Sequence, residues 1–153
     1  NDLVGTIPTD IGLNSLLQEL DLQDNSLTGT IPTEIGLWTT LTSLNFGNNF
    51  LSGIIPSQIG LLLSLSELKL SGNQLSGQVP SSLGLLTNLN ALSLDNNQFS
   101  GAVPSSLCGI SSLTLLTISG NSDLSSYPSC LNALISFMNS FPTGQPTNQP
   151  TSQ

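Results

Sequence analysis

The chain has 153 residues, of which nine are acidic and only one, Lys69, is basic, so its formal net charge is −8 at pH 7. Nucleic acids and anionic membranes are bound through cationic side chains, and we therefore expect this chain to bind neither. No apolar run is long enough to span a bilayer. Histidine, the commonest general base and metal ligand, is absent. The composition thus points away from an enzyme, and no cofactor is expected.

Apolar residues recur at a fixed period of 24 residues, beginning with the column Leu17, Leu41, Leu65, Leu89 and Leu113. A repeat of this length predicts a solenoid, in which the core is buried between neighbouring coils. The chain then divides into a half repeat at 1–16, full repeats at 17–40, 41–64, 65–88 and 89–112, and a degenerate capping repeat at 113–134. Residue 1 falls in the middle of a repeat, so we expect an upstream part to cover the first coil.

The first segment of each repeat alternates between apolar and polar residues, as in Leu68, Lys69 and Leu70. This alternation predicts strands at about 67–71 and at the equivalent positions, which would stack into a parallel sheet. A column of asparagines follows the strands, and we interpret it as a hydrogen-bonded ladder that satisfies the backbone at the bend. Its members are Asn1, Asn25, Asn49, Asn73, Asn97 and Asn121.

The return half of each repeat carries a glycine and then an Ile-Pro or Val-Pro pair, as at Gly53, Ile55 and Pro56. Glycine is needed where a side chain would clash or φ is positive. Because proline stops a long helix, we expect extended residues and short 3₁₀ turns on this side. The last repeat has Ser125 in place of the glycine and its apolar Leu124 is displaced by one residue, as is typical of a cap.

The full pattern, L-x-x-L-x-L-x-x-N-x-L-S-G-x-I-P-x-x-L-G-x-L-x-x, resembles the plant-type leucine-rich repeat over about residues 1–134, with LSGIIP and LSGQVP as its most specific elements. The resemblance implies a curved, right-handed coil with a parallel sheet on its concave face, short 3₁₀ or extended segments on its convex face, and a second small sheet near the Gly-Ile-Pro element. Such domains serve as ectodomains of receptor-like proteins or inhibit secreted wall-degrading hydrolases, and they bind proteins, peptides or small ligands on the inner face.

The two cysteines, Cys108 and Cys130, lie 22 residues apart, which is almost one repeat. Stacking would place them in adjacent coils at a separation that a disulfide can bridge, and we predict that bond. It would indicate an oxidising compartment. The alternative is a pair of small buried core residues.

After the repeats the composition changes. We interpret 135–141 as an extension of the C-terminal cap. Residues 142–153 contain P-T-x-Q three times with nothing apolar to bury, which predicts a disordered stalk. Together these features suggest an extracellular or cell-surface protein that is tethered through sequence beyond the stalk.

On the concave face, the outward strand positions and the turns after them supply the candidate ligand-binding residues Glu19, Asp21, Gln23, Asn45, Glu67, Lys69, Ser93 and Asp95. No metal site is predicted, because the sequence contains no dense run of carboxylates. The carboxylates of Glu19, Asp21 and Asp24 are a weak calcium candidate beside the simpler interpretation of a solvated face.

Two adjacent columns of apolar residues follow the glycine of each Leu-Gly or Ile-Gly pair, and they cannot both be interior. One arrangement is an apolar stripe on the convex side that contacts a partner or a second copy of the chain. The other tucks the leucines inward. The residues of this predicted stripe are Leu13, Leu37, Trp38, Leu61 and Leu85.

These features favour a non-enzymatic recognition or adhesion module that binds a protein or peptide ligand. An alternative is a secreted, wall-associated protein that binds polysaccharide or inhibits a hydrolase. A remote alternative is ice binding through the hydroxyl column Thr9, Thr33, Ser57, Ser81 and Ser105, in which only the first two members are threonine.

Overall fold

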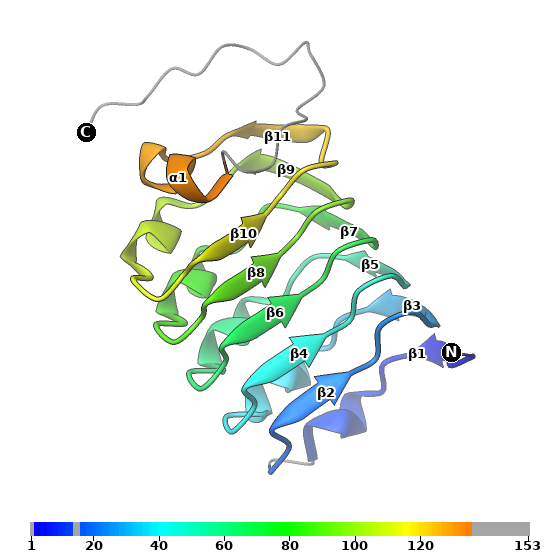
Figure 1. Ribbon diagram of the computed structural model, residues 1–153. Coiled ribbons are helices and arrows are strands. Elements are labelled where there is room, and N and C mark those ends of the chain that lie inside the picture. The colour runs from blue at the N-terminus through cyan, green and yellow to red at the C-terminus, as the bar shows by residue number, and fades with distance from the viewer. Residues whose placement is uncertain (1, 14–15, 136–153) are drawn as a thin grey trace.

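The chain winds into a stack of similar coils, and a typical coil contains an inner strand, a second strand and a 3₁₀ helix (Figure 1). This computed structural model describes residues 2–13 and 16–135. The predicted stalk at 142–153 and all but Ile135 of the predicted cap extension lie outside the described residues. Within them, the predicted leucine-rich repeat solenoid with a parallel inner sheet is confirmed.

The inner sheet has five strands in the order β10-β8-β6-β4-β2, each parallel to its neighbours and one coil apart in sequence. The strands are short, so that β6 ends at Lys69 rather than at residue 71 as predicted. Their bounds are β2 Glu19–Asp21, β4 Ser43–Asn45, β6 Glu67–Lys69, β8 Ala91–Ser93 and β10 Leu115–Thr117.

A second parallel sheet of six strands, in the order β1-β3-β5-β7-β9-β11, precedes the proline of each coil. This is the second sheet that the resemblance implied. The strands are β1 Val4–Thr6, β3 Ser26–Thr30, β5 Phe50–Gly53, β7 Gln74–Gly77, β9 Gln98–Ala102 and β11 Asp123–Ser126.

The return side of the coils consists of short 3₁₀ helices, as predicted from the prolines. The helices from η2 onward each begin directly after a proline, which occupies the N-cap position in an extended conformation with φ between −63° and −71°. They are η1 Thr9–Leu13, η2 Thr33–Leu37, η3 Ser57–Leu61, η4 Ser81–Leu85, η5 Ser105–Gly109 and η6 Ser129–Leu131, followed by one α-helical turn, α1 Asn132–Ile135.

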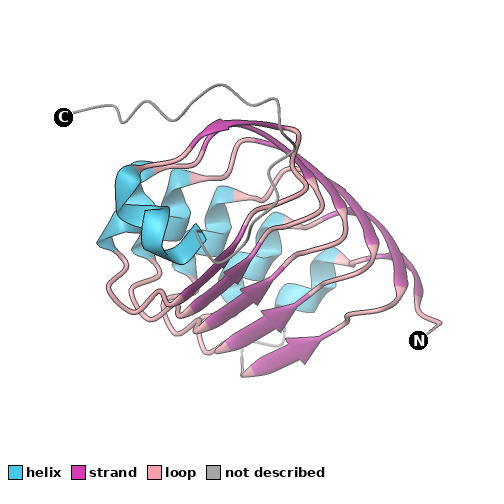
Figure 2. Ribbon diagram, turned by 45° about the horizontal axis from the view of Figure 1, so that its top comes forward, coloured by secondary structure: helices cyan, strands magenta, loops and turns pink. Residues whose placement is uncertain are grey.

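Seen along the stack, each coil is a closed three-sided loop (Figure 2). The inner sheet, the second sheet and the row of 3₁₀ helices form the three sides, and the apolar core fills the space between them. Leucines of the inner strands, such as Leu44, Leu68 and Leu92, are fully buried, as their alternation predicted. The three sides therefore present three separate outer faces to solvent.

The asparagine column forms the predicted ladder between coils. The Asn73 side-chain Nδ2 lies within hydrogen-bond distance of the carbonyls of Leu70 and Ser71 in its own coil and of Phe46 in the preceding coil, at 2.9–3.3 Å. Its Oδ1 accepts the backbone N–H of Leu51, also in the preceding coil, at 3.0 Å. One buried amide thus satisfies backbone groups of two coils, and Asn49, Asn97 and Asn121 repeat the arrangement.

The row of 3₁₀ helices is tightly packed at a column of glycines. A Cβ atom added at Gly60 would lie 2.7 Å from the carbonyl oxygen of Ser82, and one added at Gly84 would lie 2.5 Å from the Ser106 Cβ. For Gly12, Gly36, Gly60 and Gly84 the nearest contact is with the residue 22 positions later. Glycine is required here because neighbouring coils approach too closely for a side chain.

The disulfide between Cys108 and Cys130 is present, as predicted, with a Cα–Cα distance of 5.9 Å. The two cysteines are separated by the same 22 residues as the glycine contacts. Cys108 stands where the earlier coils have glycine, and Cys130 stands where the preceding coil has Ser106. Both cysteines are exposed rather than buried in the core, which excludes the alternative interpretation. The bond therefore uses a close approach that the repeat already provides.

The last coil departs from the regular register. The pairing of β11 with β9 shifts between Leu124 and Ser126, where the sequence lacks the glycine of the earlier repeats. Leu124 is nevertheless buried, so the displaced apolar residue still reaches the core.

We predict that Asn73→Ala lowers the free energy of unfolding by about 3 kcal/mol, because it leaves the buried N–H of Leu51 and carbonyls of two coils without their partner. Urea denaturation followed by the fluorescence of the single tryptophan measures the change. Asn90→Ala is the matched control, since Asn90 is exposed and its side chain makes no hydrogen bond within the described residues. A loss of similar size in both variants would contradict the ladder.

Loss of the disulfide should lower the unfolding free energy by about 3 kcal/mol, because a cross-link closing a loop of this length removes entropy from the unfolded chain. The double variant Cys108→Ser/Cys130→Ser, compared with wild type under non-reducing conditions, tests this. Wild type in reducing buffer should match the double variant. A midpoint that is insensitive to reductant would show that the bond adds no stability.

Candidate functional site

The predicted concave-face residues lie on the inner sheet and in the turns that follow its strands. Some of them contact one another across coils, because parallel stacking places equivalent positions side by side. The structure groups most of them into three hydrogen-bonded sets along the stack. Glu19 and Ser93 belong to none of these sets, because their side chains make no hydrogen bond within the described residues.

The central set is built on Glu67. Its Oε2 accepts a hydrogen bond from the Ser43 hydroxyl at 3.3 Å and forms an ion pair with Lys69 Nζ at 3.0 Å. The Glu67 and Lys69 side chains are 38% and 40% exposed, so solvent screens the pair and its contribution to stability is small. Its consequence for binding is that the single cation of the chain is already neutralised on this face.

The set nearer the N-terminus joins Gln23 to Asn45. Asn45 Nδ2 donates to Gln23 Oε1 at 2.8 Å, and Asn45 Oδ1 accepts the backbone N–H of Gly47 at 3.1 Å. Asn45 is only 7% exposed. Asn45 therefore offers little accessible surface to a ligand, and its role as a ligand contact stays a prediction. Its amide is covered and serves to hold Gln23 and the turn.

The third set converges on Asp95. Its Oδ1 accepts hydrogen bonds from the hydroxyls of Ser71, at 2.7 Å, and Thr117, and its Oδ2 accepts from Asn96. The carboxylate thus joins three consecutive coils. Ser71 and Thr117 were not among the predicted candidates, although each occupies the same outward columns as a candidate, and that shared column was the signal that could have found them.

The weak calcium candidate is not assembled. Within the described residues, no group of three or more carboxylate, cysteine or histidine side chains is arranged to hold a metal ion. Asp24 instead accepts a hydrogen bond from Asn48 Nδ2 of the next coil at 2.8 Å, and Asp21 accepts the backbone N–H of Gln23 at 3.0 Å. These carboxylates are used to order the turn after β2, so Glu19, Asp21 and Asp24 do not converge.

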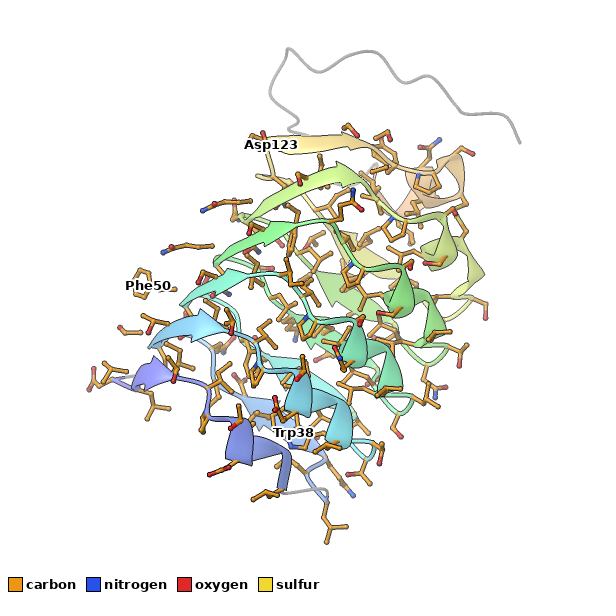
Figure 3. All side chains as sticks on the ribbon, turned by 180° about the vertical axis from the view of Figure 1, so that it is seen from behind. Trp38, Phe50 and Asp123 are labelled. Atoms are coloured by element: carbon orange, nitrogen blue, oxygen red, sulfur yellow. A yellow bond between two sulfur atoms is a disulfide. The ribbon has the colours of Figure 1, made fainter. Side chains whose placement is uncertain are left out.

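The two adjacent apolar columns are resolved in favour of an exposed stripe. Leu37, Leu61 and Leu85 are 54–58% exposed on the row of 3₁₀ helices, and Leu13 is more exposed still. Trp38 was wrongly assigned to this stripe. It is fully buried, and its indole Nε1 donates to the carbonyl of Ile11 at 2.8 Å (Figure 3). The leucines Leu62 and Leu86, in the same column as Trp38, are also buried.

The hydroxyl column proposed for ice binding opens the 3₁₀ helices and is exposed. The hydroxyls of Thr33 and Ser57 donate to the next side chain, Glu34 and Gln58 respectively. The column therefore lies on a row of helical turns and not on either flat sheet. Ice binding stays an untested prediction.

The neighbours Leu61 and Leu62 provide a test of the apolar columns. We predict that Leu62→Ala lowers the unfolding free energy by about 3 kcal/mol because it opens a cavity in the core. Leu61→Ala should cost less than about 1 kcal/mol, since roughly half of that side chain is already exposed. Urea denaturation of both variants decides the matter. Equal losses would mean that the leucine stripe is interior.

No helix among residues 2–13 and 16–135 has the length and apolar character needed to cross a membrane. A search of curated proteins finds no match to the sequence. Solved structures, in contrast, include many similar chains, among them several from Arabidopsis.

The ectodomain of the receptor kinase SOBIR1 from Arabidopsis thaliana is 38% identical, with a TM-score of 0.76, over 81% of this chain and 66% of that one. The BIR3–SERK2 complex from the same plant is 42% identical, with a TM-score of 0.69, over 77% of this chain and 62% of the other. The Arabidopsis receptor kinase HAESA, in complex with the peptide hormone IDA and the co-receptor SERK1, is 35% identical, with a TM-score of 0.79, over 89% of this chain. The present chain spans only 23% of that receptor chain.

The model of the Leucine Rich Repeat family matches residues 16–38, 40–62, 64–86 and 88–110, which together are more than half of the chain. Each match begins one residue before the leucine column that defines the period. The pattern of buried leucines, the asparagine ladder and the two parallel sheets agree with this assignment. The chain belongs to the leucine-rich repeat family, and its structural relatives place it among the plant-type members.

Proposed function

We propose that this chain is a non-catalytic, extracellular recognition module that binds a protein or peptide ligand on the solvent-facing side of the five-stranded inner sheet, which we call the inner face. The observation that carries the proposal is the inner face itself, on which side chains from successive coils are held by the hydrogen bonds around Glu67 and Asp95. Side chains that are ordered before binding lose less entropy when a ligand arrives. Related structures support the ligand class, since HAESA forms a complex with a peptide hormone and a co-receptor, and BIR3 forms a complex with another protein, SERK2.

The charge of the inner face favours a cationic ligand. Glu19 and Asp21 are exposed there, no cationic side chain of the described residues is bonded to them, and Lys69 is already paired with Glu67. A basic peptide would be steered toward this face and would supply the charges that the chain lacks. The face carries no Trp, Tyr or Arg, the residues enriched at binding hot spots, so the partner must supply the anchoring side chains.

Two further observations support an extracellular setting. The disulfide between Cys108 and Cys130 is of the kind that persists in an oxidising compartment. The related structures of SOBIR1 and BIR2 are described as ectodomains. A tether to a membrane or wall remains a proposal based on the P-T-x-Q sequence alone.

Selection of peptides from a random display library on the immobilised chain tests the proposed function. We expect the recovered peptides to be rich in Lys and Arg and to bind less tightly as salt is raised. The inner-face variant Glu19→Gln/Asp21→Asn should weaken their binding by about fivefold, the sum of two exposed charge interactions. Biolayer interferometry with a recovered peptide measures the change.

The matched control is Asp10→Asn/Glu34→Gln, which removes the same two charges from the row of 3₁₀ helices. It should leave peptide affinity within about twofold of wild type at physiological salt, where distant charges are screened. Equal weakening by both double variants would show that only net charge matters. Failure to recover any peptide that the inner-face variant affects would contradict the proposed face.

A further inference from the structure

The outer face of the second sheet differs from the rest of the surface because its four central strands carry no charge. Strand alternation points three residues of each coil outward from β3, β5, β7 and β9, or from the position directly after β5 and β7. Asp2 and Asp123 lie at the two edges of this sheet, outside the four central strands. The outward residues are Ser26, Thr28, Thr30, Phe50, Ser52, Ile54, Gln74, Ser76, Gln78, Gln98, Ser100 and Ala102.

The hydroxyls in the middle of this face are already used. Those of Thr28, Ser52 and Ser76 lie 3.3–3.5 Å from a glycine carbonyl of the preceding coil and donate to it. These small side chains therefore stay close to the sheet. They form a column between two outer columns, which include the longer side chains Phe50, Gln74, Gln98, Ile54 and Gln78.

The amides of the outer columns are free. Gln74, Gln78 and Gln98 are exposed, and their side chains make no hydrogen bond within the described residues. Each amide can donate and accept, so together they offer a neutral, polar surface to a ligand. This differs from the inner face, where the amide of Gln23 is held by Asn45.

One coil adds exposed apolar side chains beside these amides. Phe50 and Ile54 are 52% and 61% exposed, on either side of Ser52. Figure 3 shows the Phe50 ring projecting from the start of β5, away from the core. An exposed aromatic ring with free amides in the next two coils is a combination that the fold does not require, because Ser26 occupies the same column as Phe50 one coil earlier.

We propose that this face, which we name the amide face, binds an uncharged polysaccharide of the β-glucan type, with the sugar chain lying across the strands. Such a polymer presents hydroxyl groups, which the glutamine amides can donate to and accept from, and apolar C–H faces, which pack on the Phe50 ring. No charged group has to be desolvated on either side, which lowers the cost of contact. The strands repeat at roughly 4.8 Å, so a linear polymer can contact successive coils in the same way.

The charge distribution discriminates between occupants. An acidic polysaccharide is disfavoured by the net charge of −8, and a cationic peptide is better matched by the carboxylates of the inner face. A neutral polymer would gain nothing from the carboxylates of the inner face, and its hydroxyl groups match the uncharged amide face. This inference is independent of the proposed peptide function.

Co-sedimentation with insoluble cellulose and with insoluble β-1,3-glucan tests the amide face, with alginate beads as an acidic comparison. We expect the full chain to bind at least one of the two neutral glucans and not to bind alginate. Phe50→Ser, which installs the residue of the preceding coil, should weaken glucan binding by about tenfold through loss of the ring contact. Gln74→Glu, which places a charge on the face at constant shape, should weaken it by about threefold or more.

Gln58→Glu is the matched control, because it makes the same isosteric change on the row of 3₁₀ helices. It recreates the arrangement of the preceding coil, where the Thr33 hydroxyl donates to Glu34 as the Ser57 hydroxyl does to Gln58. It should bind glucan as wild type does, and so should the inner-face variant Glu19→Gln/Asp21→Asn. Circular dichroism of each variant establishes that it is folded.

Absence of binding to both glucans would overturn the proposal. Binding that Phe50→Ser and Gln74→Glu leave unchanged would also overturn it, since the glucan would then lie elsewhere. Equal losses in the folded Gln58→Glu variant would mean that charge, and not the amide face, controls retention. Peptide binding by the inner face is measured separately, so its presence or absence does not decide any of these outcomes.

Discussion

The fold depends on a single buried amide in each coil. In the middle of the stack, one asparagine side chain accepts a backbone N–H of the preceding coil and donates to carbonyls of both coils, as Asn73 does with Leu51 and Phe46. A buried backbone group without a partner is costly, so this one interaction ties the position of each coil to its neighbour. It also explains why asparagine is invariant in the column while the flanking outward positions vary freely: only an amide offers an acceptor and two donors at that length.

The opposite side of the stack is held by close approach instead of hydrogen bonding. Glycines such as Gly60 and Gly84 allow each 3₁₀ helix to approach the next one in the row more closely than a Cβ atom would permit. The same geometry makes the disulfide possible, since Cys108 and Cys130 occupy the equivalent pair of positions in the last coils. A covalent bond thus replaces van der Waals contact at the end of the stack, where the β11 register has already shifted.

Most of the fold could be predicted from the sequence because the inward columns obey strict local rules. The period of 24 residues, the alternation around Leu68, the asparagine column and the cysteine spacing were each sufficient to place their residues correctly. Which of the two apolar columns is buried could not be predicted in this way, because hydrophobicity alone does not distinguish Leu61 from Leu62.

The geometry of the 3₁₀ helix makes that distinction. With three residues per turn, a buried residue at Ile59 is followed on the same face by Leu62, and Ile35 is followed by Trp38. Leu61 and Leu37 then point outward. The exposure of individual inner-face residues was equally hidden from the sequence: Asn45 is nearly buried, and its side chain is bonded to Gln23 of the preceding coil and to the turn at Gly47. The predicted ligand contacts of this face therefore remain predictions, since a strand pattern identifies an outward position but not what lies over it.

The residues that stack the coils point inward, whereas the outward positions can vary. This difference determines where a binding site can be sought. In each coil the glycines, leucines and asparagine stabilise the stacking, so the three outer faces are free to differ in chemistry. Six of the ten charged residues, Glu19, Asp21, Asp24, Glu67, Lys69 and Asp95, lie on the inner strands or the turns after them, whereas the four central strands of the amide face have none. Because the two faces share no side chain, a ligand on one does not occupy the other. A cationic peptide and a neutral glucan could therefore be held at once, which would place a recognition event at a polysaccharide surface without requiring any change in the fold.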